Sequence, residues 1–325
     1  MDKIEEERRP SALTRHRLTL IAAACVILYA GFLQYVWGWS SLIAEWHAVG
    51  YGTVALAMLL LVSTYFVRAY RLYDYFPSQT KGRFVEVFHV TQVHNILNIM
   101  LPFRSGETSF PLLMRSEFGV GLLHGTAALL VMRLLDLHAL LAAGGLGLVL
   151  QGNRPWLEWP LWIAFLAAPL VAFFIKGPLF DFALRKSSGK PHRILESIRE
   201  GLPADAGVFV RAWVLTIVNW GTKVLVFAWC LRLLGVFPIA ASFGGALGGE
   251  LSSVLPLHAP AGVGTYPSGI AAGALLLGAD RAAPAVATLA KASVNMHLII
   301  IVSALMGAAL SILMAHGKRR LAAGA

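Results

Sequence analysis

The chain has 325 residues, of which 57% are hydrophobic and only 14% are charged, with a mean hydropathy of +0.68. Soluble domains carry about 25% charged residues, so this composition excludes a soluble protein and predicts an all-α polytopic membrane protein. The formal net charge of +10 does not indicate a nucleic-acid partner, because the basic residues lie in short stretches between apolar segments. That arrangement is typical of the cytoplasmic loops of membrane proteins.

The cysteines and the short motifs indicate no metal site, cofactor or enzymatic reaction. Cys25 and Cys230 both fall in apolar segments, so they predict neither a disulfide framework nor a metal-ligand pattern. His89 and His94 are five residues apart and face different sides of a helix, unlike the zinc-binding pair of HExxH. The sequence also lacks a GxSxG nucleophile elbow and a nucleotide-binding loop. We therefore expect no cofactor and no metal, and we predict that the chain is not an enzyme.

Six apolar segments predict membrane-spanning helices, which need about 20 mainly apolar residues. The connections at 68–83 and 176–199, and both ends of the chain, contain lysine and arginine. By the positive-inside rule these parts face the cytoplasm, while Glu45 and His47 fall in a predicted outer loop. We therefore expect a protein of the bacterial cytoplasmic (inner) membrane with cytoplasmic N- and C-termini. The expected spans cover residues 18–39, 50–70, 119–150, 160–175, 207–234 and 283–315.

Two segments break between apolar runs, and both predict re-entrant helical hairpins. The first hairpin covers 84–117 and turns at the LPFRSGE stretch of residues 101–107, where proline and glycine interrupt the helix. The second covers 239–278 and turns at residues 255–264. Irregular backbone inside a membrane is tolerated where it lines a protected cavity, so the two breaks mark the expected functional site. The hinge residues that we predict are Pro102, Gly106, Pro256, Gly262 and Gly264.

The order of spans and hairpins predicts an inverted repeat. Residues 18–150 and 159–316 each comprise two spans, a hairpin and a third span, with opposite orientations, flanked by tails at 1–17 and 317–325. Spacing agrees: Arg68 lies 34 residues before Pro102, and Lys223 lies 33 before Pro256. Many secondary transporters place such broken helices from two repeats around one central site near the bilayer midplane.

Charged and amide side chains inside the apolar segments are the candidate substrate-binding residues. An unpaired charge at the bilayer centre costs about 2.5–3.5 kcal/mol on insertion scales, so these residues imply a ligand, a wet cavity or an ion-pair network. The binding interpretation is that arginine and lysine hold a phosphate while the acids position them or contact an amine. The structural interpretation is local pairing, as between Arg133 and Asp136 at i, i+3 spacing. The candidates are Arg104, Glu107, Arg133, Asp136, Asn98, His94, Lys223, Asn219, Lys291, Asn295 and Glu250.

Several of these motifs resemble the flippase-like membrane domain of bacterial lysylphosphatidylglycerol synthases and the stand-alone membrane proteins related to it. The resemblance covers nearly the whole chain. It implies translocation of a lipid or lipid-linked headgroup between leaflets, without the aminoacyl-transfer domain of the synthases. Two positions depart from the family pattern: Phe110 replaces an arginine, and Pro267 stands where a glutamate usually follows. The matching motifs are RAYR at 68–71, LPFRSGE at 101–107, RLLD at 133–136 and AGVGTY at 261–266.

We therefore expect a lipid translocase that moves an anionic phospholipid or lipid-linked headgroup through a central site between the two hairpins. Its partners would be membrane lipids, and a lipid-modifying enzyme is a second candidate partner. Two alternatives stay open on the sequence. One is a transporter of a small organic anion, and the other is a non-transporting membrane partner of a pathway such as hopanoid or glycolipid synthesis.

Overall fold

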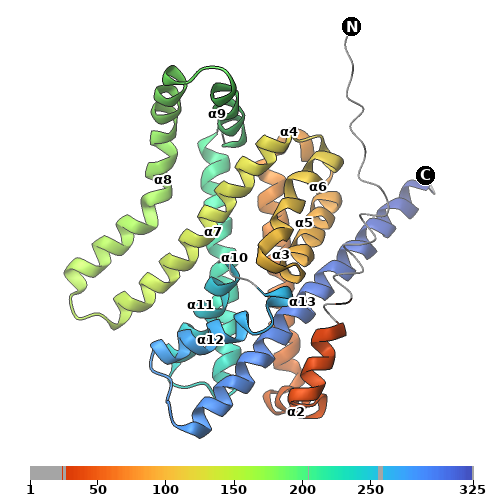
Figure 1. Cartoon of the computed structure of the whole chain (residues 1–325), viewed down its shortest axis with the longest axis vertical. Helices are drawn as coiled ribbons and strands as arrows, with labels where there is room; N and C mark the ends of the chain where they lie inside the picture. The colour runs from red at the N-terminus through yellow and green to blue at the C-terminus, as the bar shows by residue number, and fades with distance from the viewer. Residues whose placement is uncertain (1–23, 25–26, 204, 255–258, 324–325) are drawn as a thin grey trace.

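The computed structural model describes residue 24 and residues 27–203, 205–254 and 259–323, and all regular elements in this part of the chain are helices (Figure 1). The predicted all-α class is therefore confirmed. Five helices are long and apolar enough to cross a membrane, and they correspond to five of the six expected spans. The sixth, at 18–39, lies partly outside the described residues, which contain a short apolar helix, Ile27–Val36. The five are α3 (Tyr51–Tyr75), α7 (Leu122–Gln151), α8 (Pro155–Lys186), α10 (Ala206–Leu233) and α13 (Ala283–Ala323).

Two predicted loops are helical instead. The expected outer loop that holds Glu45 and His47 forms α2 (Trp39–Val49), and the basic connection at 176–199 comprises the end of α8 and the separate helix α9 (Lys190–Gly201). A four-residue helix, α4 (Pro77–Thr80), follows α3. At the start of α10 the Asp205 carboxylate accepts the backbone N–H of Val208 at 3.0 Å. This bond holds the pKa of the Asp205 carboxyl below its ordinary value.

The first broken segment forms the helix–turn–helix that the sequence predicts, with α5 (Phe84–Met100), η1 (Pro102–Thr108) and α6 (Ser109–Phe118). At a rise of 1.5 Å per residue, α5 spans only about 25 Å and cannot cross a hydrocarbon core of about 30 Å. Leu101 is extended (φ −85°, ψ 140°), because the residue before a proline disfavours the α conformation. Gly106 lies against the end of α5, where a Cβ would stand 2.4 Å from the carbonyl oxygen of Leu97.

The second broken segment comprises α11 (Ile239–Val254), η2 (Pro260–Gly262) and α12 (Thr265–Leu276), and the predicted hinge Pro256 lies outside the described residues. In each break a non-glycine residue directly after a proline takes a left-handed conformation, Phe103 at φ 52° and Ala261 at φ 55°. The two breaks also contact each other. This shared geometry agrees with the inverted repeat, which remains a prediction.

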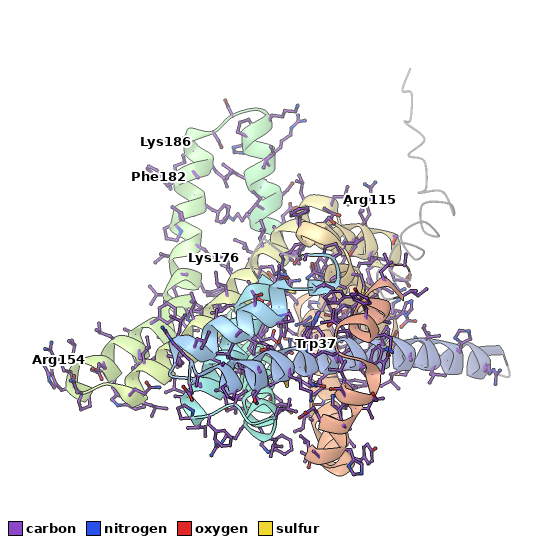
Figure 2. All side chains as sticks on the ribbon, turned by 60° about the horizontal axis from the view of Figure 1, so that its bottom comes forward. Trp37, Arg115, Arg154, Lys176, Phe182 and Lys186 are labelled. Atoms are coloured by element: carbon purple, nitrogen blue, oxygen red, sulfur yellow. The ribbon has the colours of Figure 1, made fainter. Side chains whose placement is uncertain are left out.

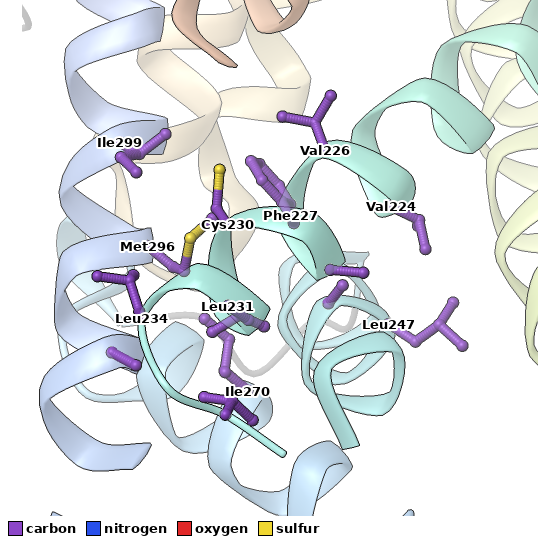
Figure 3. Close-up of a cluster of buried hydrophobic side chains, with 14 of the residues drawn as sticks. Val224, Val226, Phe227, Cys230, Leu231, Leu234, Leu247, Ile270, Met296 and Ile299 are labelled. Atoms are coloured by element: carbon purple, nitrogen blue, oxygen red, sulfur yellow. The ribbon is translucent and has the colours of Figure 1, made fainter. Parts of the chain in front are cut away.

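Glycines allow α11 and α12 to pack with their backbones almost touching. A Cβ on Gly248 would lie 2.1 Å from the carbonyl oxygen of Gly269, and one on Gly273 would lie 2.0 Å from that of Gly244. Small residues at helix contacts are the usual means of close packing in membranes. Side chains of α10, α11, α12 and α13 form the apolar cluster around this hairpin, with Cys230, Leu231, Ile270 and Met296 buried in it (Figure 3).

Helix α8 packs mainly beside α7 at the edge of the bundle and bends along its length, with prolines at 160, 169 and 178 inside it (Figure 1). No residue in its most apolar 18-residue window is buried inside the molecule. Figure 2 shows Arg154 beside one end of α8, with Lys176, Phe182 and Lys186 toward the other. Most apolar side chains of α8 are therefore available to lipid, while Leu170 and Phe173 pack against the core of the described chain.

We predict that Gly248→Ala lowers the stability of the protein by about 1–3 kcal/mol, because the added methyl group overpacks the contact between α11 and α12. The measurement is thermal unfolding of the purified protein in detergent. Gly221→Ala is the matched control, because a Cβ on Gly221 in α10 meets nothing within 4 Å. Equal melting temperatures for the two variants would contradict the close packing.

Candidate functional site

A polar cavity of about 70 Å³ lies where the two breaks meet α3, α7, α10 and α13. Five of the predicted binding residues line it: Asn98, Arg104, Arg133, Lys223 and Glu250. The sequence did not assign the other polar and aromatic lining residues to the site. These are Tyr65, Arg68, Asn95, Trp220, Ser253, Tyr266 and His297.

Arg104 joins the two breaks across the cavity. Its backbone is left-handed (φ 54°), which costs roughly 1–3 kcal/mol for a residue other than glycine. Its guanidinium donates to the Glu107 carboxylate in the same break and to the backbone carbonyl of Ser253 at the end of α11. The side chain is only 11% exposed. The strained backbone therefore presents a buried cation that links one hairpin to the other.

Glu107 couples this break to α7 and α5. Its carboxylate accepts from Nε and Nη2 of Arg133, each at 3.1 Å. Nη2 of Arg133 also lies 3.3 Å from Nε2 of His94, whose Nδ1 lies 3.0 Å from the Ser109 hydroxyl. The ring of Phe110 packs edge-on against His94 and so helps to hold His94 in place.

Asp136 is the most deeply buried acid of this cluster, with a side chain only 1% exposed. Its Oδ1 accepts from Nη1 of Arg71 at 2.7 Å and from the indole N–H of Trp220 at 2.9 Å. Its Oδ2 accepts from Nη1 of Arg133 at 3.1 Å, the local pair that the i, i+3 spacing indicates. Arg71 also donates to the Thr216 hydroxyl at 2.6 Å, so one carboxylate ties α3, α7 and α10 together.

The opposite wall holds a further ion pair, separate from the cluster of Glu107 and Asp136. The Lys223 ammonium lies 3.0 Å from Oε2 of Glu250, and the Tyr266 hydroxyl donates to Oε1 at 3.1 Å. The same ammonium lies 4.7 Å from the centre of the Trp220 ring, within reach of a cation–π interaction. The Glu250 side chain is 1% exposed and that of Lys223 is 12% exposed. Pro267 falls in the first turn of α12, where a helix tolerates proline.

Arg68 and Arg71 are not loop residues, which corrects the topological interpretation of this stretch. Both lie within α3 and point into the protein, Arg71 toward Asp136 and Arg68 toward the cavity. Arg68 donates to the amide oxygen of Asn95 at 3.0 Å, and its guanidinium lies 6.0 Å from the centre of the Trp220 ring. Within the described part of the chain it forms no ion pair with an acid.

The cavity and the side chains directly behind it thus carry more cations than acids. The five cations are Arg68, Arg71, Arg104, Arg133 and Lys223, and the three acids are Glu107, Asp136 and Glu250. The formal surplus is two positive charges. A surplus of this kind in a largely buried place attracts an anionic ligand, because unpaired charge there is costly.

Six of the predicted binding residues do not line the cavity. His94, Glu107 and Asp136 lie directly behind it, each in contact with the lining residue Arg133, and the other three lie apart from it. Lys291 pairs with Glu45 on α2, and Asn295 accepts the indole N–H of Trp46 at 2.7 Å. Asn219 is buried in α10, and its side-chain oxygen has no hydrogen-bond partner among the described residues. The lysine and the two asparagines are therefore placed outside the site. The predicted hinges Gly262 and Gly264 both take positive φ, at 70° and 76°.

The comparisons with known proteins give one result. Residues 19–304 match the family described as the lysylphosphatidylglycerol synthase TM region, so the chain belongs to this family. No curated protein and no solved structure matches the chain.

We predict that Asp136→Asn destabilises the protein by about 3–5 kcal/mol, because it leaves the buried guanidinium of Arg71 without its charge partner. Glu117→Gln is the matched control, since the Glu117–Arg83 pair is 44% and 38% exposed and contributes less than about 1 kcal/mol. Thermal unfolding of both variants in detergent measures the difference. A loss for Asp136→Asn no larger than that of the control would contradict the role of this carboxylate.

Proposed function

The chain is a member of the lysylphosphatidylglycerol synthase membrane-region family, and we propose that it translocates an anionic phospholipid or lipid-linked headgroup between leaflets. The observation that carries the proposal is the surplus of two positive charges around a cavity between two helix breaks. A phosphate supplies the missing negative charge. Arginine suits it best, because the planar guanidinium can bind two phosphate oxygens at once.

Arg68 is the cation best placed to receive the phosphate. The other four cations are already paired with Asp136, Glu107 or Glu250. The hydrogen bond to Asn95 and the face of Trp220 orient the guanidinium without neutralising it. A preorganised, uncompensated cation gains more from an incoming anion than one that must first leave its own carboxylate.

The arrangement supports a movement of the two hairpins relative to each other. The cavity of about 70 Å³ has room for a few water molecules, so a whole lipid headgroup needs more space than this state provides. The hydrogen bond from Arg104 to the Ser253 carbonyl is a polar contact between the two hairpins beside the cavity. If this bond breaks and the two hairpins move apart, the cavity could open toward one leaflet and then toward the other, which is alternating access.

The small volume of the cavity also favours one other candidate, a transporter of a small organic anion. The ligands of the two candidate functions both carry a negative charge such as that of a phosphate, but only the lipid carries acyl chains. A lipid must enter sideways from the membrane, whereas a soluble anion enters from water.

We also propose the bacterial cytoplasmic (inner) membrane as the location, with both termini in the cytoplasm. With Arg68 and Arg71 inside the protein, the remaining support comes from Lys81 and Arg83 after α3 and from the basic end of α8 (Figure 2). Labelling of single cysteines placed at residues 82 and 188 by a membrane-impermeant reagent should fail in intact cells and succeed after lysis.

We predict that the protein, reconstituted in liposomes, accelerates the exchange of fluorescent phosphatidylglycerol between leaflets. Arg68→Gln should slow this exchange at least about tenfold, because it removes one charge-assisted hydrogen bond to the phosphate. Arg211→Gln is the matched control, because that arginine pairs with Asp74 at 2.9 Å, is 51% exposed and lies outside the cavity. Exchange by the control should equal that of the wild type.

An Arg68→Gln variant that folds and exchanges lipid at the wild-type rate would refute the assignment of the site. If the wild type moves glycerol 3-phosphate into liposomes but no lipid, the soluble-anion candidate is correct instead.

A further inference from the structure

Each of the three acids around the cavity is already bound to cations of the protein itself. Asp136 holds Arg71 and Arg133, Glu107 holds Arg104 and Arg133, and Glu250 holds Lys223. A ligand that carries an ammonium group would therefore find no carboxylate free to accept it within the described site.

The surroundings of Lys223 are those of an ammonium-binding site. The Lys223 ammonium lies 3.0 Å from the Glu250 carboxylate, 4.7 Å from the centre of the Trp220 ring and 5.7 Å from that of Phe227. Tyr266 completes the group by donating its hydroxyl to the same carboxylate. Aromatic faces beside a carboxylate are how proteins bind ligand ammonium groups. Here the Lys223 ammonium itself occupies the position beside Glu250 and the aromatic rings.

We propose that this cavity selects a headgroup that carries an anionic phosphate and no ammonium group, and that Lys223 is the residue that sets this selectivity. The inference rests on the proposed function and narrows it to one class of headgroup. Arg68 receives the phosphate, and Lys223 occupies the place where an ammonium would otherwise bind.

Exclusion of an amine follows from two costs. To bind Glu250 the amine must displace Lys223, which leaves a buried lysine without its partner. To bind elsewhere in the cavity it must stay beside a surplus of positive charge, and like charges in contact oppose binding. A headgroup with phosphate alone meets neither cost and neutralises part of the surplus.

The direct test compares labelled lipids in liposomes of one composition. Wild-type protein should exchange phosphatidylglycerol at least about tenfold faster than phosphatidylethanolamine or lysylphosphatidylglycerol. The reason is that the ammonium of the latter two lipids meets one or more like charges in the cavity. Thermal stabilisation of the detergent-solubilised protein by each lipid should follow the same order. Glycerol 3-phosphate and phosphoethanolamine, tested in the same way, separate binding of a free phosphate from binding of a lipid.

Variants then test Lys223 itself. Lys223→Met releases Glu250 and should raise binding and exchange of phosphatidylethanolamine relative to phosphatidylglycerol about tenfold. Lys223→Met/Glu250→Gln, which removes both charges, should show no such gain. Lys291→Met is the matched control, because the Lys291–Glu45 pair lies outside the cavity and is 32% and 33% exposed. It should keep the wild-type preference.

The inference is overturned if the wild type binds or exchanges the ammonium-bearing lipids as well as phosphatidylglycerol, whatever the variants do. That result leaves the proposed translocation intact. Conversely, selective binding without any exchange would refute translocation and support the selectivity. If Lys223→Met does not fold, the wild-type comparison and the double variant still decide the question.

Discussion

The buried carboxylate of Asp136 is the interaction on which the rest of the structure depends. It neutralises Arg71 and Arg133 and accepts the indole N–H of Trp220, so that α3, α7 and α10 meet at one point. Asp136 binds only one N–H-bearing nitrogen of Arg133. The other nitrogens of that guanidinium therefore donate to Glu107 in the first break. Glu107 in turn holds Arg104, which reaches the second hairpin. The ion pairs thus form a chain from the centre of the bundle to the contact between the breaks.

This chain also explains the charge of the cavity. Every acid near it satisfies cations that the fold itself requires, and Arg68 is the cation left over within the described residues. A protein that needed these residues only for stability would gain by matching its charges, because an uncompensated charge in a membrane interior is costly. The excess is therefore the feature that links the fold to an anionic ligand, and it supports the proposed binding of a lipid phosphate.

Much of the fold could be predicted from the sequence, because hydropathy and helix breakers act locally. The spans and both breaks follow from apolar length and from proline and glycine, and the Arg133–Asp136 pair follows from helical spacing. Arg68 was misread because an arginine near the end of an apolar run looks the same whether it enters a loop or a cavity. Its position three residues after Tyr65 on the same helix face was the available signal. The partners of Lys223 and Lys291 depend on packing between distant helices, so spacing alone could not separate the residue inside the cavity from the one outside it.

The most direct test of the account is an experimental structure of the protein in a lipid nanodisc that contains phosphatidylglycerol. The account predicts a phosphate group within about 3 Å of the Arg68 guanidinium, between the two helix breaks, with its acyl chains leaving toward the membrane. A lipid headgroup bound only outside the bundle, with Arg68 paired to an acid of the protein, would contradict it.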